Sequence, residues 1–576
     1  MKESIKKVFS TSLLAGIAAL ISLIAQYGFY LNAPTLDLFR HLDCVIALYF
    51  VLSYFVHIFK SNKKWKAIRS APLESILLLL FVLSFITEGV LKLQVLFTDI
   101  AITNIKVYYI IVQIYVISNT LIALAKTRDN WLFISLKPSR IFIFSFFIVI
   151  LIGVCLLKLP RASYNGISWI NALFISTSAV CITGLTPLNI VDTFTPIGQG
   201  IILLLFQIGG LGIVTLTSFI ALVFQQKGAF RFKDQVILME ILDDGNLNKI
   251  GEMLRSIIRI TFVFELFGAA LLWLRWGKLG LSPQNRLFSA IFHSVSAYCN
   301  AGFSNLQKGL ETVGYNRDPV TMLTIIVLII VGGLGFYTMQ DILYKKKYNS
   351  GNRRHLTLQT RMILFISGTL ILLGAIIVTT LQWKDWVNMP AWLRVLNGLF
   401  TSVTSRTAGF STVSISMLSM PTLILVMLLM YIGASPNSTG GGIKVTTFGT
   451  LLAASWAFIR GKDRVEIAWN TIPMTTVRRS YIVLLGSLIL ITIAIFSISI
   501  VESAKFSDLL FEVISAFGNV GLSRGITPQL SGFSKIIITI VMFMGRVGLY
   551  TLSIAVGRES VVQYNYSFSE TNIMVG

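Results

Sequence analysis

Long apolar stretches separated by short polar segments run through the whole chain. The first four, each about 20 residues long, lie at 11–31, 40–60, 72–89 and 104–126. Because about 20 apolar residues in a helix cross the hydrocarbon core of a bilayer, each stretch predicts a membrane-spanning helix. Lysines precede the first stretch, as in a signal peptide, but no small-residue cleavage pattern follows it. We therefore expect the first helix to be retained.

From about residue 140 onward, the apolar pattern repeats four times. Each repeat has a span-length stretch, a shorter segment rich in Ser and Thr that breaks at a glycine, and a second long stretch. The short segments cannot cross a bilayer, so they should enter it and turn back, which requires protein or water around their exposed backbone. The short segments lie at 168–180, 284–298, 392–405 and 507–517. The long stretches lie at 141–158, 256–276, 361–381 and 481–501 before them and at 195–225, 319–344, 422–456 and 532–557 after them.

This pattern predicts an all-α polytopic membrane protein with twelve full spans. Four pseudo-repeated helix–pore loop–helix units surround one central pore, and four N-terminal transmembrane helices precede them. The N-terminal helices form an accessory region that cannot sense voltage in the usual way, because no Lys or Arg lies between Lys106 and Lys126. The expected regions are the accessory region at 1–135, pore repeats one and two at 136–230 and 250–347, pore repeat three with a broken inner helix at 356–460, and pore repeat four with the C-terminal tail at 475–576.

A glycine ends the short segment of every repeat, at Gly184, Gly302, Gly409 and Gly521. A second glycine signature follows each of them after 24 to 30 residues, beginning at Gly209, Gly332, Gly433 and Gly545. Glycines that only pack helices together are common in membrane bundles. Two linked signals that recur four times favour a pore over packing alone.

The same arrangement suits a cation. Pore helices present their partially negative C-terminal ends to the site that follows them, and glycine allows backbone angles that turn carbonyl oxygens inward. A ring selective for divalent ions would carry Asp or Glu, whereas the four segments carry none, so a monovalent ion such as potassium is favoured. The candidate potassium-binding filter residues are Ile182, Thr183, Gly184, Asn300, Ala301, Gly302, Thr407, Ala408, Gly409, Asn519, Val520 and Gly521.

Composition excludes several other classes of protein. With 55% hydrophobic and 13% charged residues, the chain is too apolar for a soluble fold. The net charge of +23 does not indicate nucleic-acid binding, because the basic residues are dispersed among loops. Clusters such as Lys345–Lys347 and Arg353–Arg354 predict that both termini are cytoplasmic and that the glycine turns face the outside. No nucleophile, metal cluster or pair of carboxylates is set in a pocket, so no enzyme activity is expected.

Three strings carry a family resemblance: VCITGL (Val180–Leu185), SRTAGFS (Ser405–Ser411) and MGRVGLYT (Met544–Thr551). Residues 140–576 resemble the Trk/Ktr/HKT superfamily of potassium transporters, in which one chain folds four helix–pore–helix units around a potassium-channel-like pathway. The resemblance implies a homodimer in the lipid bilayer of a bacterial inner membrane and a cytosolic regulator-of-conductance ring that binds ATP, ADP or NAD. Potassium is then the only expected ion, with no covalent or nucleotide cofactor in this chain. Gly184 favours potassium, because sodium-selective plant relatives commonly carry serine there.

The third inner stretch departs from its siblings, since it reads IGASPNSTGGGIKVTT from Ile432 to Thr447. Proline and a glycine run break a helix and free backbone groups that need other partners. The resemblance implies that this loop lies under the filter and acts as a gate, while a static kink is the alternative. The candidate gate residues are Gly433, Ala434, Ser435, Pro436, Asn437, Ser438, Thr439, Gly440, Gly441, Gly442, Lys444 and Arg546.

Arg546 stands where two siblings carry glycine. A guanidinium inside a span is costly, so we expect it to face the pore below the filter and to oppose cation passage; the alternative is a helix-end arginine that reaches toward the cytoplasm. We expect Arg406 to point behind the filter toward an acid such as Glu512. His293 and Glu512 are assigned to packing and hydrogen bonding.

The leading hypothesis is gated, channel-like potassium uptake across the plasma membrane, driven by the membrane potential, with an influence of sodium or protons left open. No chain of Asp and Glu residues indicates a proton relay, which disfavours tight proton coupling. The alternatives are the potassium-binding subunit of a multi-subunit potassium-pumping ATPase and a sodium-permeable relative.

Overall fold

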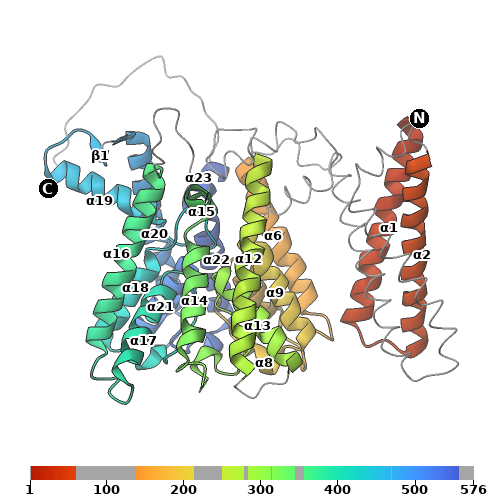
Figure 1. The fold of residues 1–576 in the computed structure, drawn as a ribbon, viewed down its shortest axis with the longest axis horizontal. Helices are drawn as coiled ribbons and strands as arrows, with labels where there is room; N and C mark the ends of the chain where they lie inside the picture. Colours follow the sequence, from red (N-terminus) through yellow and green to blue (C-terminus); the bar gives the residue numbers. More distant parts are fainter. Residues whose placement is uncertain are drawn as a thin grey trace.

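The computed structural model describes residues 2–59, 138–212, 250–277, 283–312, 314–343, 356–468 and 470–556. Helices dominate these residues, and most of the long ones run roughly along one direction (Figure 1). The sheet in this part of the chain is an antiparallel hairpin of β1 (Val465–Ile467) and β2 (Asn470–Ile472). The predicted all-α class is confirmed.

Two N-terminal helices, α1 (Lys2–Gly28) and α2 (Ala33–Phe59), pack together at one edge of the molecule (Figure 1). Asp43 joins them, because its carboxylate accepts hydrogen bonds from Ser22 Oγ and Gln26 Nε2, both at 2.7 Å. The backbone N–H of Arg161 donates to the carbonyl of Gly28 at 3.0 Å and links α1 to the first pore unit. The leading helices predicted at 72–89 and 104–126 lie outside the described residues.

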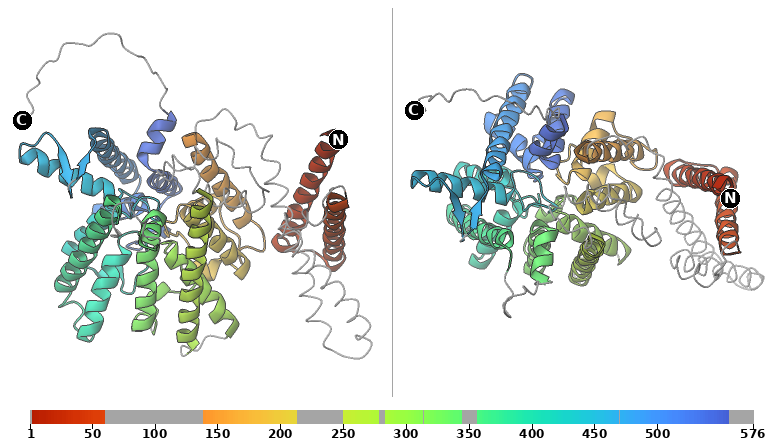
Figure 2. Two further views of the ribbon diagram at one scale, coloured as in Figure 1. Left: turned by 45° about the horizontal axis from the view of Figure 1, so that its top comes forward. Right: turned by 90° about the horizontal axis from the view of Figure 1, so that it is seen from above.

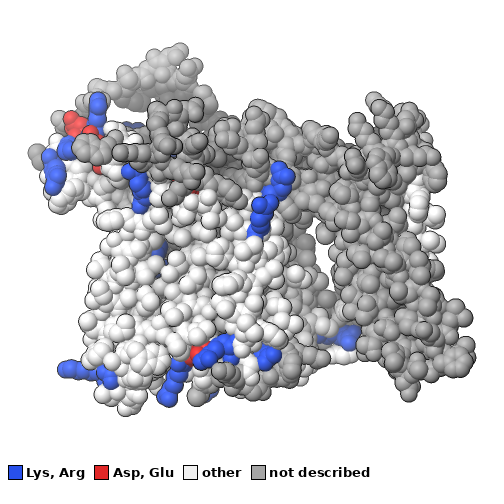
Figure 3. Space-filling view, viewed as in Figure 1, with Lys and Arg blue, Asp and Glu red and all other residues white. Residues whose placement is uncertain are grey.

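Each of the four units begins with a long apolar helix. By length and composition, these are the four helices of the described residues that could cross a membrane alone. Their outer faces are apolar and exposed; the side chain of Phe365 is 75% exposed and that of Phe496 is 68% exposed. On the face shown in Figure 3, Lys and Arg gather near the two ends, and a wide band almost without charge lies between them. The outer helices are α6 (Pro138–Leu157), α12 (Ile250–Trp276), α16 (Leu358–Leu381) and α20 (Met474–Ser499).

A short helix follows each outer helix and packs against it, as the sequence predicts. Serine hydroxyls explain part of the Ser-rich composition of these segments. Ser176 Oγ donates to the carbonyl of Ile150 at 2.7 Å, and Ser402 Oγ donates to that of Ile371 at 2.8 Å. These bonds fasten the pore helices of units one and three to the backbone of their outer helices. The short helices are α7 (Trp169–Val180), α13 (Pro283–Tyr298), α17 (Ala391–Thr404) and α21 (Phe506–Gly518).

Single-turn helices lead from the pore helices to the inner helices. Two of the inner helices begin with a polar cap followed by proline, at Thr195–Pro196 and Asp318–Pro319, which satisfies free N–H groups and presets the first helical turn. The single turns are α8 (Ile190–Thr193), η5 (Gly309–Glu311), η6 (Ile415–Met417) and η7 (Thr527–Gln529). The inner helices are α9 (Pro196–Leu211), α14 (Pro319–Gly333), α18 (Met420–Tyr431) and α22 (Gly532–Val547).

The inner helices of units two and four bend sharply, so the prediction of continuous helices at 319–344 and 532–557 is wrong. The chain turns by 98° between α14 and α15 (Phe336–Leu343) and by 89° between α22 and α23 (Leu549–Val556). Gly335 and Gly548 stand at the bends with φ of +83° and +86°. An α-helix cannot continue through that left-handed conformation, which glycine adopts at little cost.

The third inner helix is broken, as the sequence predicts. α18 ends at Tyr431 and α19 (Val445–Ile459) begins at Val445, so residues 432–444 form a loop. The β1–β2 hairpin after α19 is not anticipated by the sequence analysis; Val465 packs there among Ala454, Ala457 and Val477. Of the twelve predicted spans, the described residues contain the four span-length helices and the two bent pairs, while the apolar part of α1 (Leu14–Gly28), α9, α18 and α19 are shorter.

The four units follow one another around a common centre (Figure 2). Each inner helix contacts the pore helix of the next unit, and α22 of the last unit contacts α7 of the first. The cycle of contacts is α9 with α13, α14 with α17, α18 with α21, and α22 with α7. The four units therefore form a closed ring.

Candidate functional site

The four glycines predicted to line the filter lie at the centre of this ring and take left-handed backbone angles. Their φ values are +86° at Gly184, +68° at Gly302, +77° at Gly409 and +91° at Gly521. The residue two positions earlier also has a positive φ in every unit. Those residues are Ile182 at 59°, Asn300 at 55°, Thr407 at 131° and Asn519 at 50°. The fourfold repeat of the sequence is thus a fourfold repeat of backbone conformation.

The glycines approach one another in chain order. A Cβ atom built on Gly184 would lie 3.1 Å from Cα of Gly302, one on Gly302 would lie 3.1 Å from Cα of Gly409, and the step from Gly409 to Gly521 is the same. A Cβ atom on Gly521 would lie 3.0 Å from Cα of Gly184, which closes the cycle. Each such Cβ would also meet the carbonyl oxygen of the residue before the next glycine. Those residues, Thr183, Ala301, Ala408 and Val520, are candidate filter residues and are all buried.

Backbone hydrogen bonds hold three of the four turns in the same way. The N–H of Thr183 donates to the carbonyl of Ser178 at 2.7 Å, and equivalent bonds join Ala301 to Ser296 at 2.7 Å and Val520 to Ser515 at 2.9 Å. The third turn differs, because Ala408 N–H donates to Thr404 at 2.9 Å, one residue closer in sequence. Unit three is therefore the irregular member of the glycine ring as well as of the inner helices.

In three units, a serine two residues after the ring glycine forms a hydrogen bond with an ionisable side chain, which fixes the segment that follows the glycine. Ser304 Oγ lies 2.8 Å from His293 Nε2, and Ser411 Oγ donates to Glu311 at 2.6 Å. Ser523 donates to Glu512. His293 and Glu512 occupy the same position of pore helices two and four, nine residues before the glycine. The assignment of these two residues to packing and hydrogen bonding is confirmed, and their repeated position places both beside the segment that follows the glycine.

The loop between α18 and α19 lies directly against the filter. A Cβ on Gly440 would be 2.7 Å from Thr407 Oγ1, and one on Gly441 would be 2.7 Å from Cγ of Asn519. The loop closes on itself through the N–H of Gly433, which donates to the carbonyl of Ile443 at 2.9 Å. It joins unit two through the N–H of Ser435, which donates to the carbonyl of Gly333 at 3.2 Å, and through Asn437, whose carbonyl accepts from the N–H of Phe336 at 3.1 Å.

Thr439 connects the loop to the second filter segment. With the Asn300 amide oriented so that all its polar atoms are satisfied, its Oδ1 accepts from Thr439 Oγ1 at 3.0 Å and from Thr407 Oγ1 at 3.3 Å. Its nitrogen then donates to the carbonyls of Ala297 and Ile329 at 3.1 and 3.3 Å. The filter and the loop therefore share one network of hydrogen bonds.

Arg546, at the end of α22 in unit four, links the loop between α18 and α19 to unit one. Its Nη1 donates to the carbonyl of Thr439, and its Nη2 donates to the carbonyl of Gly209 at the end of α9, at 2.8 Å. The guanidinium is thus held inside the ring on the backbone of units one and three, which contradicts the alternative of an arginine reaching toward the cytoplasm. Lys444 is satisfied within the loop, where its Nζ donates to the carbonyl of Gly440 at 2.5 Å.

Arg406 is buried behind the filter, but the predicted pairing with Glu512 is wrong. The guanidinium donates to Ser367 Oγ and to the carbonyl of Gly433, both at 3.2 Å. Glu512 instead accepts from Ser523 and Thr527 within unit four. The reason is topological: α17 packs against α16 of its own unit, whereas Glu512 lies on α21.

The sequence analysis missed a buried acid in unit two. Glu265 on α12 is only 4% exposed and accepts a hydrogen bond from Gln207 Nε2 of α9 at 3.2 Å. The thiol of Cys299, one residue before the second filter segment, lies 3.9 Å from Glu265 Oε1 and 3.5 Å from Gln207 Oε1. A lone glutamate inside an apolar stretch of sequence was the available signal.

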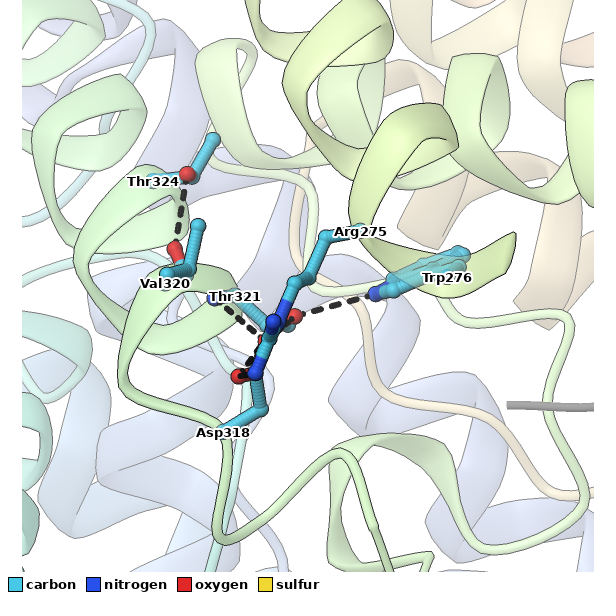
Figure 4. Close-up of polar contacts among 6 residues, drawn as sticks. All are labelled: Arg275, Trp276, Asp318, Val320, Thr321 and Thr324. Carbon is cyan, nitrogen blue, oxygen red and sulfur yellow. Dashed lines mark hydrogen bonds and ion pairs between the residues drawn. The ribbon is translucent and has the colours of Figure 1, made fainter. Parts of the chain in front are cut away.

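An ion pair fastens the start of α14 to the end of α12 (Figure 4). Arg275 donates to Asp318 Oδ1 from Nε at 2.8 Å and from Nη2 at 2.6 Å, while Asp318 Oδ2 caps α14 through the N–H of Thr321 at 3.0 Å. Burial opposes the charge of Asp318, but the hydrogen bonds from Arg275 and Thr321 and the charge of Arg275 outweigh it and lower the pKa of this carboxyl.

Four outer helices with re-entrant pore helices and a closed glycine ring define a multi-pass membrane protein built from four pore units. In the part of the chain that the structure describes, no three His, Cys, Asp or Glu residues are grouped to hold a metal ion. The chain belongs to the TrkH family of cation transport proteins, whose family model matches residues 111–562.

Individual relatives agree over most of the chain. Ktr system potassium uptake protein B of Bacillus subtilis is 34% identical over 440 residues, which cover 74% of this chain and 95% of the relative. Potassium/sodium uptake protein NtpJ of Enterococcus hirae is 34% identical over 456 residues, covering 77% of this chain and 98% of the relative. The crystal structure of the potassium transporter TrkH from Vibrio parahaemolyticus superposes with a TM-score of 0.61 over 84% of this chain and 97% of that chain. At 19% sequence identity, this last match supports the fold alone.

Proposed function

We propose that this chain takes up potassium through the ring of four filter segments. The observation that carries the proposal is the closed cycle from Gly184 through Gly302 and Gly409 to Gly521, with a carbonyl-bearing residue before each glycine. Four pore helices end at this ring and present partial negative charge to it. Relatives named potassium uptake proteins and potassium/sodium uptake protein support a monovalent cation as the substrate.

In this proposal, the twelve filter residues bind dehydrated potassium through carbonyl and hydroxyl oxygens rather than through carboxylates. The loop at residues 433–444 is the gate, because it packs against Thr407 and Asn519 of the filter. Arg546 latches the gate through Thr439, and its positive charge opposes a cation that leaves the filter. The latch must release for ions to pass.

The surroundings of the pore follow from the same proposal. The chain lies in the plasma membrane, a bacterial inner membrane, with both termini in the cytoplasm, and the membrane potential drives uptake with ~2.3 kcal/mol per charge at 100 mV. A homodimer above a cytosolic nucleotide-binding ring is the expected assembly. Of the described residues, the bent helices α15 and α23 are the parts that we expect to lie nearest to such a ring.

Rescue of a cell that lacks its own potassium uptake and potassium-pumping ATPases tests the function. The intact chain is expected to restore growth at micromolar to millimolar potassium, and tracer uptake is expected to favour potassium over sodium. Failure to rescue without an added ATPase partner would favour a pump subunit, and equal sodium flux would favour a sodium-permeable relative.

A matched pair of glycine substitutions ties the rescue to the ring. In Gly302→Ala, the new Cβ would lie 2.6 Å from the carbonyl oxygen of Ala408, and the residue would keep a φ of +68°. Gly166 has a similar φ of +71°, but nothing lies within 4 Å of its Cβ position. Gly302→Ala should abolish growth rescue while Gly166→Ala keeps it. Equal growth of the two variants would contradict the filter assignment.

A further inference from the structure

Glu265 is an acid buried at the middle of a membrane-spanning helix. It lies near the centre of the apolar stretch Leu254–Trp276, and its side chain is 4% exposed. An ionised carboxylate in such a place loses its hydration and needs a cation or several strong hydrogen-bond donors to replace it. Ionisable residues inside membrane spans are rare, and they commonly serve ion or proton binding.

The surroundings of Glu265 supply neither a cation nor enough donors for an ionised carboxylate. Its hydrogen-bond donors are the Gln207 amide at 3.2 Å and the more distant Cys299 thiol at 3.9 Å. An ionised carboxylate offers about four acceptor sites. No ion pair of the described residues includes Glu265, so a proton is the simplest way to neutralise it.

The other ionisable groups on the packed elements do not supply the missing charge. α13 carries Arg286, His293 and Tyr298, and Cys299 follows it directly. Arg286 lies over the ring of Trp273 at 4.7 Å, His293 is hydrogen-bonded to the Ser289 carbonyl and to Ser304 Oγ, both at 2.8 Å, and the hydroxyl of Tyr298 accepts from Thr261 at 3.2 Å. α9 and α14 carry no ionisable side chain, and α15 carries Tyr337 and Asp341. Asp341 accepts two hydrogen bonds from Thr357, at the start of α16.

The remaining charges are arginines. On α12 itself, Arg259 stands six residues before Glu265, about 9 Å along the helix axis, and Arg255 lies a further turn away. Arg546 reaches the carbonyl of Gly209, two residues after Gln207, but its guanidinium is engaged there and by the carbonyl of Thr439.

The same cluster touches both the filter and the anchor of the gate. Cys299 immediately precedes Asn300 of the second filter segment, and Ser294 Oγ of the pore helix donates to the backbone carbonyl of Glu265 at 2.6 Å. Gln207 stands two residues before Gly209, whose carbonyl accepts from Arg546. A charge that appears at Glu265 therefore acts on the end of α9, where the latch is attached, and on the base of the second filter segment.

We propose that Glu265, Gln207 and Cys299 form a proton-binding site behind the second filter segment, and that the protein conducts ions while Glu265 holds the proton. When rising pH removes this proton, the carboxylate must recruit water or draw donors toward itself. Gln207 and Cys299 are the groups that can move, so the α9 end and the filter segment lose their conducting arrangement. Ion flux then falls as pH rises.

The neutral isostere Glu265→Gln tests this proposal, which uses the proposed potassium uptake only as a readout. Tracer rubidium flux is measured in proteoliposomes of the purified full chain across about pH 5 to 9, a range that begins near the ordinary pKa of a glutamate and extends well above it. Wild-type flux is expected to fall by at least about fivefold toward high pH, which corresponds to a modest shift of a two-state equilibrium. Glu265→Gln should keep the flux of the acidic range at every pH. The matched control is Glu466→Gln, at an exposed glutamate paired with Lys462, which should keep the wild-type profile.

An unchanged pH profile in Glu265→Gln would overturn the proposal, and so would a folded Glu265→Gln that conducts at no pH, because a neutral residue would then not suffice. Thermal unfolding of the wild-type protein in detergent provides a readout that does not depend on transport. Since the buried acid is stabilised by its proton, the unfolding temperature should fall as pH rises, and this fall should be smaller in Glu265→Gln. If wild-type flux is absent while the unfolding data follow this expectation, the potassium function fails and the proton site stands. Equal pH dependence of unfolding in both proteins would remove the proton site.

Discussion

Replacing Arg546 by glutamine should open the pore in the absence of any activating partner. The arginine makes two hydrogen bonds from a charged group, to the carbonyls of Thr439 and Gly209. Such bonds contribute ~1.5–3 kcal/mol each. Because Arg546 is only half-buried and water can replace part of the loss, we take the lower end of their sum, ~3 kcal/mol, which corresponds to a factor of about 150 between the latched and released loop.

Tracer rubidium uptake into proteoliposomes without a cytosolic regulator measures this change. Glutamine removes the charge and one arm of the latch, so resting flux should rise by at least about tenfold, short of the full factor because the filter also limits conduction. Arg394→Gln is the control, because Arg394 also donates to backbone carbonyls, those of Met389 at 2.8 Å, Val387 at 2.7 Å and Trp383 at 3.3 Å, but lies away from the loop. Its flux should match that of the wild type.

Arg546→Lys separates the latch from the charge. Lysine keeps the positive charge but is a point donor that cannot span two carbonyls as a planar guanidinium does. If the latch dominates, Arg546→Lys should leak like Arg546→Gln; if repulsion of the ion dominates, it should stay closed like the wild type. Wild-type resting flux in Arg546→Gln would refute both roles of this residue.

Two further predictions concern the braces around the ring. Glu512→Gln should lower the selectivity for potassium over sodium in competitive tracer uptake, because the amide accepts the hydrogen bond of Ser523 less strongly than a carboxylate does, and unaltered selectivity would contradict the bracing role. Asp318→Asn keeps the cap of α14 but loses the ion pair with Arg275, so thermal unfolding near neutral pH should show a loss of less than ~1 kcal/mol, since Arg275 is 38% exposed. The pKa of Asp318 is lowered in the folded protein, so the ion pair stabilises the folded protein at pH values above the unfolded-state pKa of this carboxyl. The difference in stability between wild type and variant should therefore vanish as pH falls through the folded-state pKa. A stability difference that persists in acid would show that the charge of Asp318 does not cause it.

The recurrent features of this protein could be predicted from sequence because each signal occurs four times. The pore helices, their glycine ends and the broken third inner helix were all expected, and the described residues contain them. The bends at Gly335 and Gly548 were not expected, because an apolar run of span length predicts one continuous helix even where a glycine takes a positive φ.

Single residues were harder to place. The direction of Arg406 depends on which helix packs behind the third pore helix, and no local pattern encodes that neighbour. Glu265 occurs once, in one unit, and its partners, Gln207 on α9 and Cys299 just after α13, are distant in sequence. A repeat reveals shared architecture, while the side chains that distinguish the units are visible only once the units are assembled.

The closed ring of four glycines comes from one gene rather than from four copies of one subunit. In a channel of identical subunits, every substitution enters the pore four times, and no position can be varied alone. Here Gly184, Gly302, Gly409 and Gly521 are encoded separately, so selection can alter one quarter of the ring while three quarters hold the ion. An ion pathway of this kind can acquire a single loop, a single arginine or a single acid in small steps, without passing through a form in which the whole filter has changed.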